Sequence, residues 1–205
     1  MIAGRAVAGW LALSFTFVVA LLAGLAACSK PAAESFKATD ITGAAFGRHL
    51  SLTDHHGKPR NLEDFKGKAV VVFFGYTHCP DVCPMTLAAL REVKEKLGPD
   101  GGKLQVLFVT VDPERDTQQV LSVYVPAFDA DFLGLYGDLE ATQQAAKEFK
   151  IFFTRSAGST PSSYTVDHSA SVFVFDQQGR LRLFASPTFT VDSYLHDIRM
   201  LLAGR

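Results

Sequence analysis

Two short apolar runs that are rich in β-branched residues constrain the fold more than any other feature of the chain. Residues 69–74 (AVVVFF) form a continuously apolar run, as strands buried on both faces of a sheet do, and residues 104–111 (LQVLFVTV) are expected to form a second buried strand. Between them the spacing predicts a helix over residues 81–97. Its expected inward face repeats every three or four residues and consists of Val82, Met85, Ala89, Val93 and Leu97. A strand, a helix and a second buried strand together predict an α/β fold with a mostly parallel centre.

The rest of the chain continues this alternation. Further helices are expected over residues 117–128, 138–149 and 191–202, with short strands over 151–154, 171–175 and 181–185. The last two strands flank a loop that contains Gly179, which predicts a β-hairpin before the final helix. Asp138 is placed to cap the start of its helix. The expected architecture is therefore a mixed sheet flanked by helices, with a hairpin and a helix at the C-terminal end.

Composition limits the function classes. The 205 residues correspond to about one domain. Lys and Arg total 20 and Asp and Glu total 21, so the formal net charge is −1. This balance argues against nucleic acid as a partner, because such proteins carry a clustered positive excess.

The first thirty residues look like a targeting segment. Arg5 precedes an uncharged apolar stretch, which is the layout of a secretory signal. The stretch ends in Leu-Ala-Ala-Cys28, which resembles a bacterial lipobox. We expect a lipoprotein signal peptide over residues 1–27, a lipid on Cys28 and a flexible tether over residues 28–46. The alternative is an uncleaved membrane anchor. Both interpretations place residues 47–205 outside the cytoplasm, on the periplasmic side of a bacterial membrane.

The other two cysteines, Cys79 and Cys83, lie where a predicted central strand leads into a helix. Backbone amides at a helix N-terminus stabilise an anion, so a cysteine there tends to have a lowered pKa. Residues four apart on a helix are about 5–6 Å apart at Cβ. With a modest adjustment the pair can form a disulfide, and it also suits copper(I). The alternative is two buried cysteines that act only as small apolar residues.

Three segments carry a resemblance to a known family. Residues 74–84 (FGYTHCPDVCP), 111–117 (VDPERDT) and 164–169 (YTVDHS) resemble the motifs of the SCO/SenC family in order and spacing. These thioredoxin-fold proteins assist assembly of the binuclear copper site of cytochrome c oxidase. The resemblance implies a thioredoxin-like copper-binding domain over residues 47–205. It also implies copper ligation by Cys79, Cys83 and His168, as copper(I) or, with a weak further ligand, as copper(II).

Several other polar residues have two interpretations. Asp167 either orients His168 or is a surface acid. His55 and His56 are expected to be solvated turn residues rather than metal ligands. Asp112 and Asp116 are expected to serve turns and a helix cap, although Asp112 or Arg115 near the metal loop is the functional alternative.

The leading hypothesis is a membrane-tethered copper metallochaperone. Its expected partner is the copper-site subunit of cytochrome c oxidase, and other periplasmic copper chaperones or thiol reductants are further candidates. The second hypothesis is a thiol–disulfide oxidoreductase in which Cys79 and Cys83 are the catalytic pair, which leaves enzymatic activity open. A redox or copper sensor is a third hypothesis, and a peroxiredoxin-like activity a weaker one.

Overall fold

The computed structural model describes residues 35–158, 163–169, 171–186 and 188–205. The predicted signal peptide, Cys28 and residues 28–34 of the predicted tether lie outside these ranges. Within the described part of the chain, no helix has the length and apolar character needed to cross a membrane.

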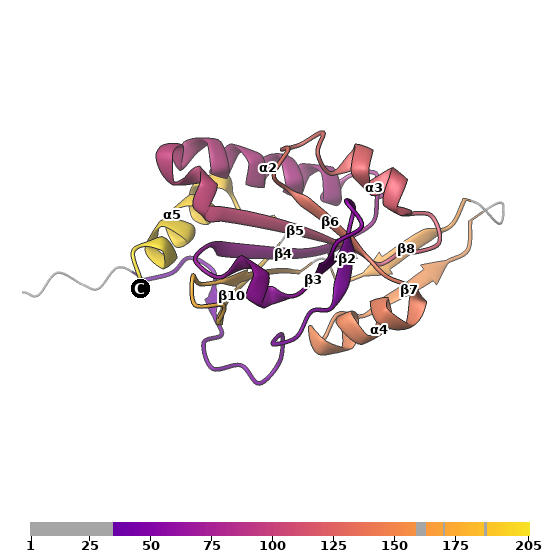
Figure 1. Ribbon diagram of the computed structural model, residues 1–205, viewed down its shortest axis with the longest axis horizontal. Helices are drawn as coiled ribbons and strands as arrows, with labels where there is room; N and C mark the ends of the chain where they lie inside the picture. Colours follow the sequence, from indigo (N-terminus) through magenta and orange to yellow (C-terminus); the bar gives the residue numbers. More distant parts are fainter. Residues whose placement is uncertain (1–34, 159–162, 170, 187) are drawn as a thin grey trace, which may run out of the picture. The chain divides into compact units, whose positions relative to one another are not determined.

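An eight-stranded mixed sheet forms the centre of the domain (Figure 1), in the order β1-β10-β9-β4-β5-β6-β2-β3. Its three middle strands β4, β5 and β6 are parallel, and every other pairing is antiparallel. The strands are β1 (Thr39–Asp40), β2 (Leu52–Asp54), β3 (Pro59–Arg60), β4 (Ala69–Gly75), β5 (Leu104–Thr110), β6 (Leu133–Tyr136), β9 (Val172–Phe175) and β10 (Leu181–Ala185). The predicted α/β class with a mixed central sheet and a C-terminal hairpin is confirmed.

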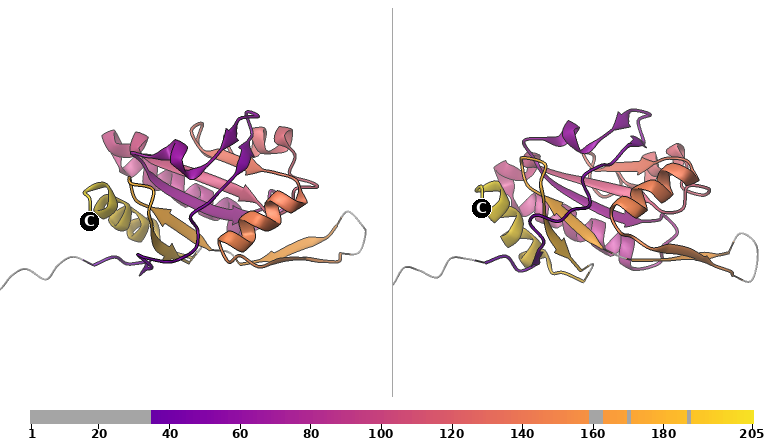
Figure 2. Two further views of the ribbon diagram at one scale, coloured as in Figure 1. Left: turned by 60° about the horizontal axis from the view of Figure 1, so that its bottom comes forward. Right: turned by 90° about the horizontal axis from the view of Figure 1, so that it is seen from below.

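Helices cover both faces of this sheet (Figures 1 and 2). The α-helices are α2 (Val82–Lys96), α3 (Gln118–Tyr124), α4 (Leu139–Glu148) and α5 (Val191–Leu202), and the 3-10 helices are η2 (Leu62–Phe65) and η3 (Gly98–Lys103). Buried side chains of α2, α3 and α5 pack against one face, and those of α4 and η2 pack against the other. Asp138 caps α4 as predicted, because its carboxylate accepts the Ala141 N–H at 2.8 Å.

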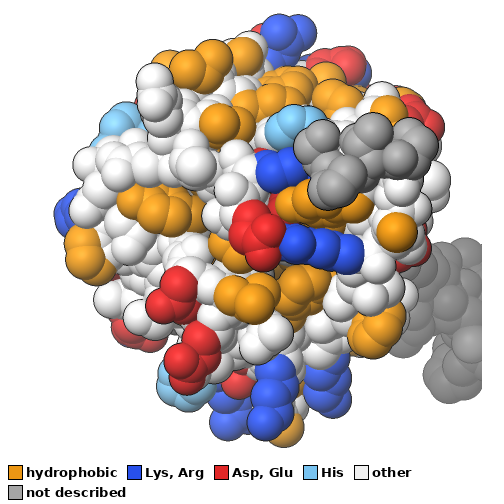
Figure 3. All heavy atoms as spheres, turned by 90° about the vertical axis from the view of Figure 1, so that its right-hand side faces the viewer, with side chains coloured by type: hydrophobic (Ala, Val, Ile, Leu, Met, Phe, Trp, Pro, Cys, Tyr) orange, Lys and Arg blue, Asp and Glu red, His pale blue; other side chains and the backbone are white. Residues whose placement is uncertain are grey.

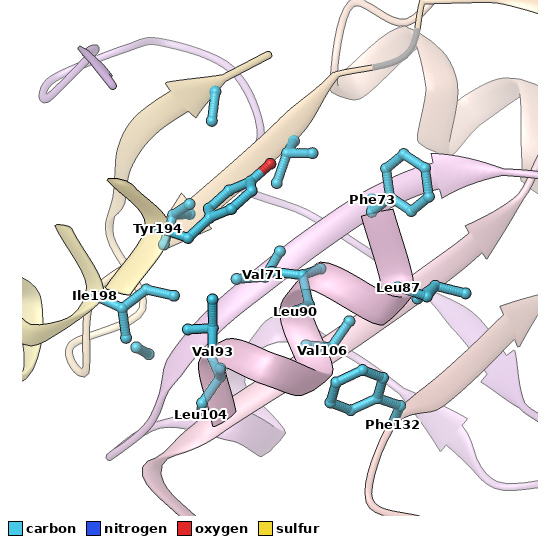
Figure 4. Close-up of a cluster of buried hydrophobic side chains, with 14 of the residues drawn as sticks. Val71, Phe73, Leu87, Leu90, Val93, Leu104, Val106, Phe132, Tyr194 and Ile198 are labelled. Atoms are coloured by element: carbon cyan, nitrogen blue, oxygen red, sulfur yellow. The ribbon is translucent and has the colours of Figure 1, made fainter. Parts of the chain in front are cut away.

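The two-sided packing explains why the central strands are almost entirely apolar. Along β4, Val71 and Phe73 face the α2–α5 layer, whereas Val70 and Val72 face the opposite layer. Figure 4 shows Leu87 of α2 and Ile198 of α5 among the labelled side chains of the first layer. A strand in this position has no solvent face on which polar residues would be favourable.

The inward face of α2 agrees with the predicted one near its C-terminal end and differs from it in the first half. Val93 and Leu97 are buried as predicted, whereas Met85 is 65% exposed. Cys83, Leu87 and Leu90 are buried in its place, so the first half of the helix is rotated relative to the expected stripe. Packing on the sheet thus selects an apolar stripe that includes Cys83.

Part of the predicted tether is held on the domain. Both carboxylate oxygens of Asp197 accept backbone N–H groups, from Lys37 and Ala38, each at 2.8 Å. Strand β1 then pairs with β10, and Phe46 packs edge-on against Phe173 with ring centroids 6.3 Å apart. The structure therefore differs from the predicted boundary, since residues 36–46 belong to the folded unit. Partly buried apolar side chains pack this segment against the core at irregular spacing, so the sequence shows no apolar period; they are Phe36, Ala38, Ile41, Ala44 and Phe46.

A second, two-stranded sheet stands apart from the main one. Strands β7 (Phe153–Ser156) and β8 (Thr165–His168) pair antiparallel, with Phe153 opposite His168. Both strands reach out beyond α4 in Figures 1 and 2. We call β7 and β8 the arm. The arm lies next to the loop between β4 and α2, and this position brings His168 towards that loop.

Candidate metal centre

A six-residue loop joins the end of β4 to the start of α2 and carries Cys79, while Cys83 lies in the first turn of α2. The Cys79 N–H donates to the Tyr76 carbonyl at 3.2 Å, which turns the loop back toward β4. Pro84 follows in the same first turn, where its missing N–H removes no intrahelical hydrogen bond. The structure confirms the predicted position of the two cysteines at a strand-to-helix junction.

The two sulfur atoms have different surroundings. Cys83 is completely buried, Cys79 is half-buried, and both are free thiols. Gly75 provides the space for the buried sulfur, because a Cβ atom there would lie 2.8 Å from Cys83 Sγ. The same Cβ would lie 2.8 Å from the Phe108 ring. The pair therefore combines one enclosed thiol with one that solvent reaches.

The pKa of Cys83 moves opposite to the direction expected for a helix N-terminus. Burial strongly raises the pKa of this thiol, and a hydrogen bond from the Tyr76 backbone offsets the rise only in part. The neighbouring Cys79 and the Asp116 carboxylate raise it further. Without a cation, Cys83 thus holds its proton. A bound metal ion would displace that proton, because its charge stabilises the thiolate directly.

His168 ends β8 and is partly buried beside Tyr76, with the two ring centroids 5.9 Å apart in an edge-on arrangement. Its Nδ1 atom is buried and has no hydrogen-bond partner among the described residues. Burial lowers the pKa of the ring, and a contact with the Ser169 backbone opposes this only in part. His168 is therefore held in the neutral form, which is the form that binds metals.

The structure brings Cys79 and Cys83 together and places His168 close by, across Tyr76. The Tyr76 backbone forms a hydrogen bond to Cys83, and the Tyr76 ring contacts His168. Over the described residues, no three His, Cys, Asp or Glu side chains are already arranged to hold a metal ion. Two thiols and a neutral imidazole with an orphaned nitrogen nevertheless form a donor set that fits a soft metal such as copper.

Sequence reasoning missed the role of Asp116. Its buried carboxylate accepts the Thr77 N–H at 3.0 Å, the Thr77 hydroxyl at 2.5 Å and the Thr110 hydroxyl at 2.6 Å. These bonds tie the start of the cysteine-bearing loop to the end of β5. The expected helix cap is supplied instead by Thr117, whose side chain accepts from Val120. Burial raises the pKa of Asp116, although all three hydrogen bonds oppose the rise.

Asp112 and Arg115 do more than form a turn. Asp112 accepts a hydrogen bond from the Tyr164 hydroxyl at 2.7 Å, and Arg115 donates to the Tyr164 carbonyl at 3.0 Å. Tyr164 directly precedes β8, so both residues contact the segment that carries His168. The alternative that Asp112 or Arg115 lies near the proposed metal site thus describes these residues better than a role in the turn alone.

The expectation that His55 is solvated is wrong. His55 is only 3% exposed, and its Nδ1 accepts the Gly134 N–H at 3.0 Å, because the turn after β2 packs against β6. His56 is exposed, as expected for a turn residue. Asp167 is an exposed acid that accepts the Ser156 hydroxyl across the arm. This contact favours the surface interpretation of Asp167 over a role in orienting His168.

Comparison with known proteins shows a consistent family relationship. The SCO1/SenC family model matches residues 38–203. The mouse "Protein SCO2 homolog, mitochondrial" is 35% identical over 164 residues, covering 78% of this chain and 64% of the relative. The human "Protein SCO1 homolog, mitochondrial" is 32% identical over 180 residues, covering 83% and 59%. The chain thus spans less than two thirds of the length of these relatives.

Solved structures agree with the sequence relatives. The structure of Bradyrhizobium japonicum ScoI with copper bound has a TM-score of 0.71 and 34% identity, covering 77% of this chain and all of that one. The solution structure of apo Sco1 from Thermus thermophilus has a TM-score of 0.75 and 41% identity, covering 83% of this chain and 99% of that one. From the family match and these identities we conclude that the chain belongs to the SCO1/SenC family.

Proposed function

We propose that this protein is a membrane-tethered copper metallochaperone that binds copper through Cys79, Cys83 and His168. Its proposed task is to assist assembly of the binuclear copper site of cytochrome c oxidase. The observation that carries this proposal is the pair of free thiols at the start of α2, next to a buried histidine nitrogen that has no hydrogen-bond partner within the described part of the chain. Copper-bound structures of relatives support the choice of metal.

This set of ligands suits a metal ion that the protein carries and then transfers to another protein. Two thiolates bind copper(I) in a near-linear or trigonal geometry, and their negative charges offset the charge of the metal. The third proposed ligand comes from the arm, which is a sheet separate from the one that precedes the cysteine loop. The two thiols and the imidazole therefore come from separate parts of the fold. Such a split ligand set allows transfer to a recipient by exchange of one ligand at a time.

The proposed location follows from the N-terminal sequence. With Cys28 lipidated, the domain would face the periplasmic side of a bacterial membrane, where the copper-site subunit of the oxidase is the proposed recipient. Mass spectrometry of the purified protein tests this directly. The expected N-terminus is a diacylglyceryl-modified Cys28. A protein that keeps residues 1–27 and an unmodified Cys28 thiol would show that the leader acts as an uncleaved anchor.

Copper titration of the full-length reduced chain in mild detergent tests the ligands. We expect one copper per chain, lost in Cys79→Ala and Cys83→Ala, and an altered copper(II) visible spectrum in His168→Ala. His49→Ala is the matched control, because His49 is an exposed histidine away from the site. Zinc or no metal in protein purified anaerobically would contradict the proposal. An unchanged spectrum in His168→Ala would show that the ligand assignment is wrong.

The unequal burial of the two thiols favours a second candidate function, thiol–disulfide reduction. The half-exposed Cys79 would attack a partner disulfide as the thiolate and form a mixed disulfide. The enclosed Cys83 would then attack Cys79, so that the partner leaves as a dithiol and this chain becomes the disulfide. His168 takes no part in these steps. His168→Ala is therefore expected to keep reductase activity and to lose copper delivery, whereas loss of both would contradict the separation.

A further inference from the structure

The arm meets the body of the domain at three stacked side chains. The ring of Tyr164 has two guanidinium groups over it: Arg115 Cζ lies 3.6 Å from the ring centroid and Arg155 Cζ lies 4.5 Å from it. Arg115 belongs to the turn after β5, Arg155 to β7, and Tyr164 directly precedes β8. We call these three residues the clamp. Figure 3 views the molecule from the side of the arm and shows basic and acidic side chains next to hydrophobic ones near the centre of this face.

Carboxylates tie the clamp to the body. Asp112 accepts Arg115 Nε at 2.5 Å and the Tyr164 hydroxyl at 2.7 Å, and it is completely buried. Glu114 pairs with Arg155 at 2.6 Å. Two positive and two negative charges thus balance at this junction. A carboxylate as buried as Asp112 is stable only with such partners, so the junction strongly favours the observed position of Tyr164.

The two halves of the clamp differ in strength. The Arg115 side chain is 16% exposed and that of Arg155 is 44% exposed. A guanidinium over an aromatic ring is more favourable when it is desolvated, so the Arg115–Tyr164 contact contributes more. Arg115 also lies over the Tyr76 ring at 5.9 Å. Tyr76 is the residue whose ring contacts His168, which gives the clamp a second connection to the site.

The position of Tyr164 is transmitted to His168 along one short strand. They are four positions apart in extended chain, about 13 Å. In the middle of β8, Val166 is buried in the same cluster as Tyr76. Pairing with β7 along the whole strand, from Ser156 opposite Thr165 to Phe153 opposite His168, keeps β8 straight. A strand anchored at its start and middle has little freedom at its end.

We propose that Arg115, Tyr164 and Arg155 are positioning residues for the His168 ligand: the clamp holds β8 where His168 reaches a metal bound by Cys79 and Cys83. This inference rests on the proposed function. It has a distinctive consequence, because two thiolates alone suffice for copper(I), whereas copper(II) depends on the additional imidazole. Loosening the clamp is therefore expected to weaken copper(II) binding selectively.

The experiment uses the full-length chain in mild detergent and compares copper(I) affinity, copper(II) affinity and the copper(II) spectrum. Tyr164→Ala is expected to weaken copper(II) binding by about 10- to 100-fold, as loss of a group that supports a metal ligand does. Copper(I) affinity is expected to stay unchanged. Arg155→Ala should show a smaller loss in the same direction. Arg91→Ala is the control, because this arginine is exposed on α2, where it pairs with Glu95 one turn further along.

A metal-free measurement tests the clamp without copper. Amide hydrogen exchange in β8 is expected to be faster in Tyr164→Ala and Arg155→Ala than in the wild type, with exchange in β4 unchanged. Should Tyr164→Ala fail to fold, Tyr164→Phe and Arg155→Ala decide the question. The phenylalanine keeps the ring over the guanidinium groups and loses only the bond to Asp112. Wild-type copper(II) affinity in both of these variants would overturn the inference.

The double variant Tyr164→Ala/His168→Ala separates positioning from a general structural effect. If the clamp acts through His168, the double variant binds copper(II) as His168→Ala does. If the losses of copper(II) affinity in the two single variants added up in the double variant, the inference would be overturned while the proposed function stayed intact. If His168→Ala alone equals the wild type, the ligand assignment fails and the inference fails with it. Comparing the single variants thus shows which of the two is wrong.

Discussion

At the scale of single residues, Gly75 sets how closely the cysteine loop approaches the core. A Cβ atom there would lie 2.8 Å from both Cys83 Sγ and the Phe108 ring. Gly75→Ala is therefore expected to reduce the free energy of unfolding by about 1–3 kcal/mol, as overpacking of a core does. It should also weaken copper(I) binding, because the displaced atom is a proposed ligand.

Gly102→Ala is the control for this prediction, because a Cβ at Gly102 would meet no atom within 4 Å. Denaturant unfolding and copper(I) competition titration measure the two effects. If Gly75→Ala and Gly102→Ala had the same free energy of unfolding and the same copper(I) affinity, the space beside Cys83 would not limit stability or binding.

His55 makes stability depend on pH. Burial lowers the pKa of this ring, the neighbouring His56 lowers it further, and Asp54 only partly opposes the shift. The unfolded chain, with a histidine pKa of about 6.5, then binds a proton more readily than the folded protein does. The contribution of His55 is complete above pH ~6.5 and decreases as the pH falls below that value.

We therefore expect the free energy of unfolding to fall between pH 7 and pH 5, and expect His55→Gln to reduce this slope. The glutamine side chain can still accept the Gly134 N–H. His49→Gln should keep the wild-type slope, because His49 is exposed. Denaturant unfolding at several pH values measures the slope, and an identical slope in wild type and His55→Gln would contradict the assignment.

At the scale of elements, α5 anchors the segment that leads into the sheet. Asp197 receives the backbone N–H groups of Lys37 and Ala38. Asp197→Ala leaves these two groups without their acceptor, which costs about 1–3 kcal/mol if they stay buried. We expect the segment to detach instead, with faster amide exchange at residues 37–41 and new proteolytic cleavage before β2.

Asp192→Ala is the matched control on the same helix, because this exposed acid only meets Lys96 at 3.5 Å. It should leave exchange and cleavage unchanged. If amide exchange at residues 37–41 were as slow in Asp197→Ala as in the wild type, the β1–β10 pairing alone would be enough to hold the segment.

At the scale of the whole molecule, the proposed metal links the cysteine loop to the arm. A ligand that binds only the folded state at about 100 times its dissociation constant stabilises by about 2.7 kcal/mol. For a domain of this size that corresponds to a rise in Tm of roughly 5–10 °C. We expect this rise with copper(I), none in Cys79→Ser, and none with magnesium in the wild type. A copper-independent Tm in the wild type would contradict specific binding.

Most of the fold could be predicted from local patterns. Mainly apolar runs marked β4 and β5, because strands buried on both faces disfavour polar residues. The helix periods and the Asp138 cap are also local, since each involves residues within a few positions of one another. The motifs around Cys79, Cys83 and His168 marked the candidate site for the same reason, as each is a short contiguous segment.

The features that only the tertiary structure decided depend on contacts between residues far apart in the chain. Asp116 meets Thr77 across 39 positions, and Asp197 meets Lys37 across 160. Neither contact leaves a periodic trace in the sequence. The rotation of α2, which exposes Met85, and the raised pKa of Cys83 likewise follow from packing and burial. The sequence by itself determined the central strands β4 and β5, the α-helices, the C-terminal hairpin and the candidate thiol and imidazole ligands, but not the short strands β1, β2, β3, β6 and β8. Their burial, protonation and support were decided by the fold, because desolvation and long-range hydrogen bonds exist only once distant segments meet.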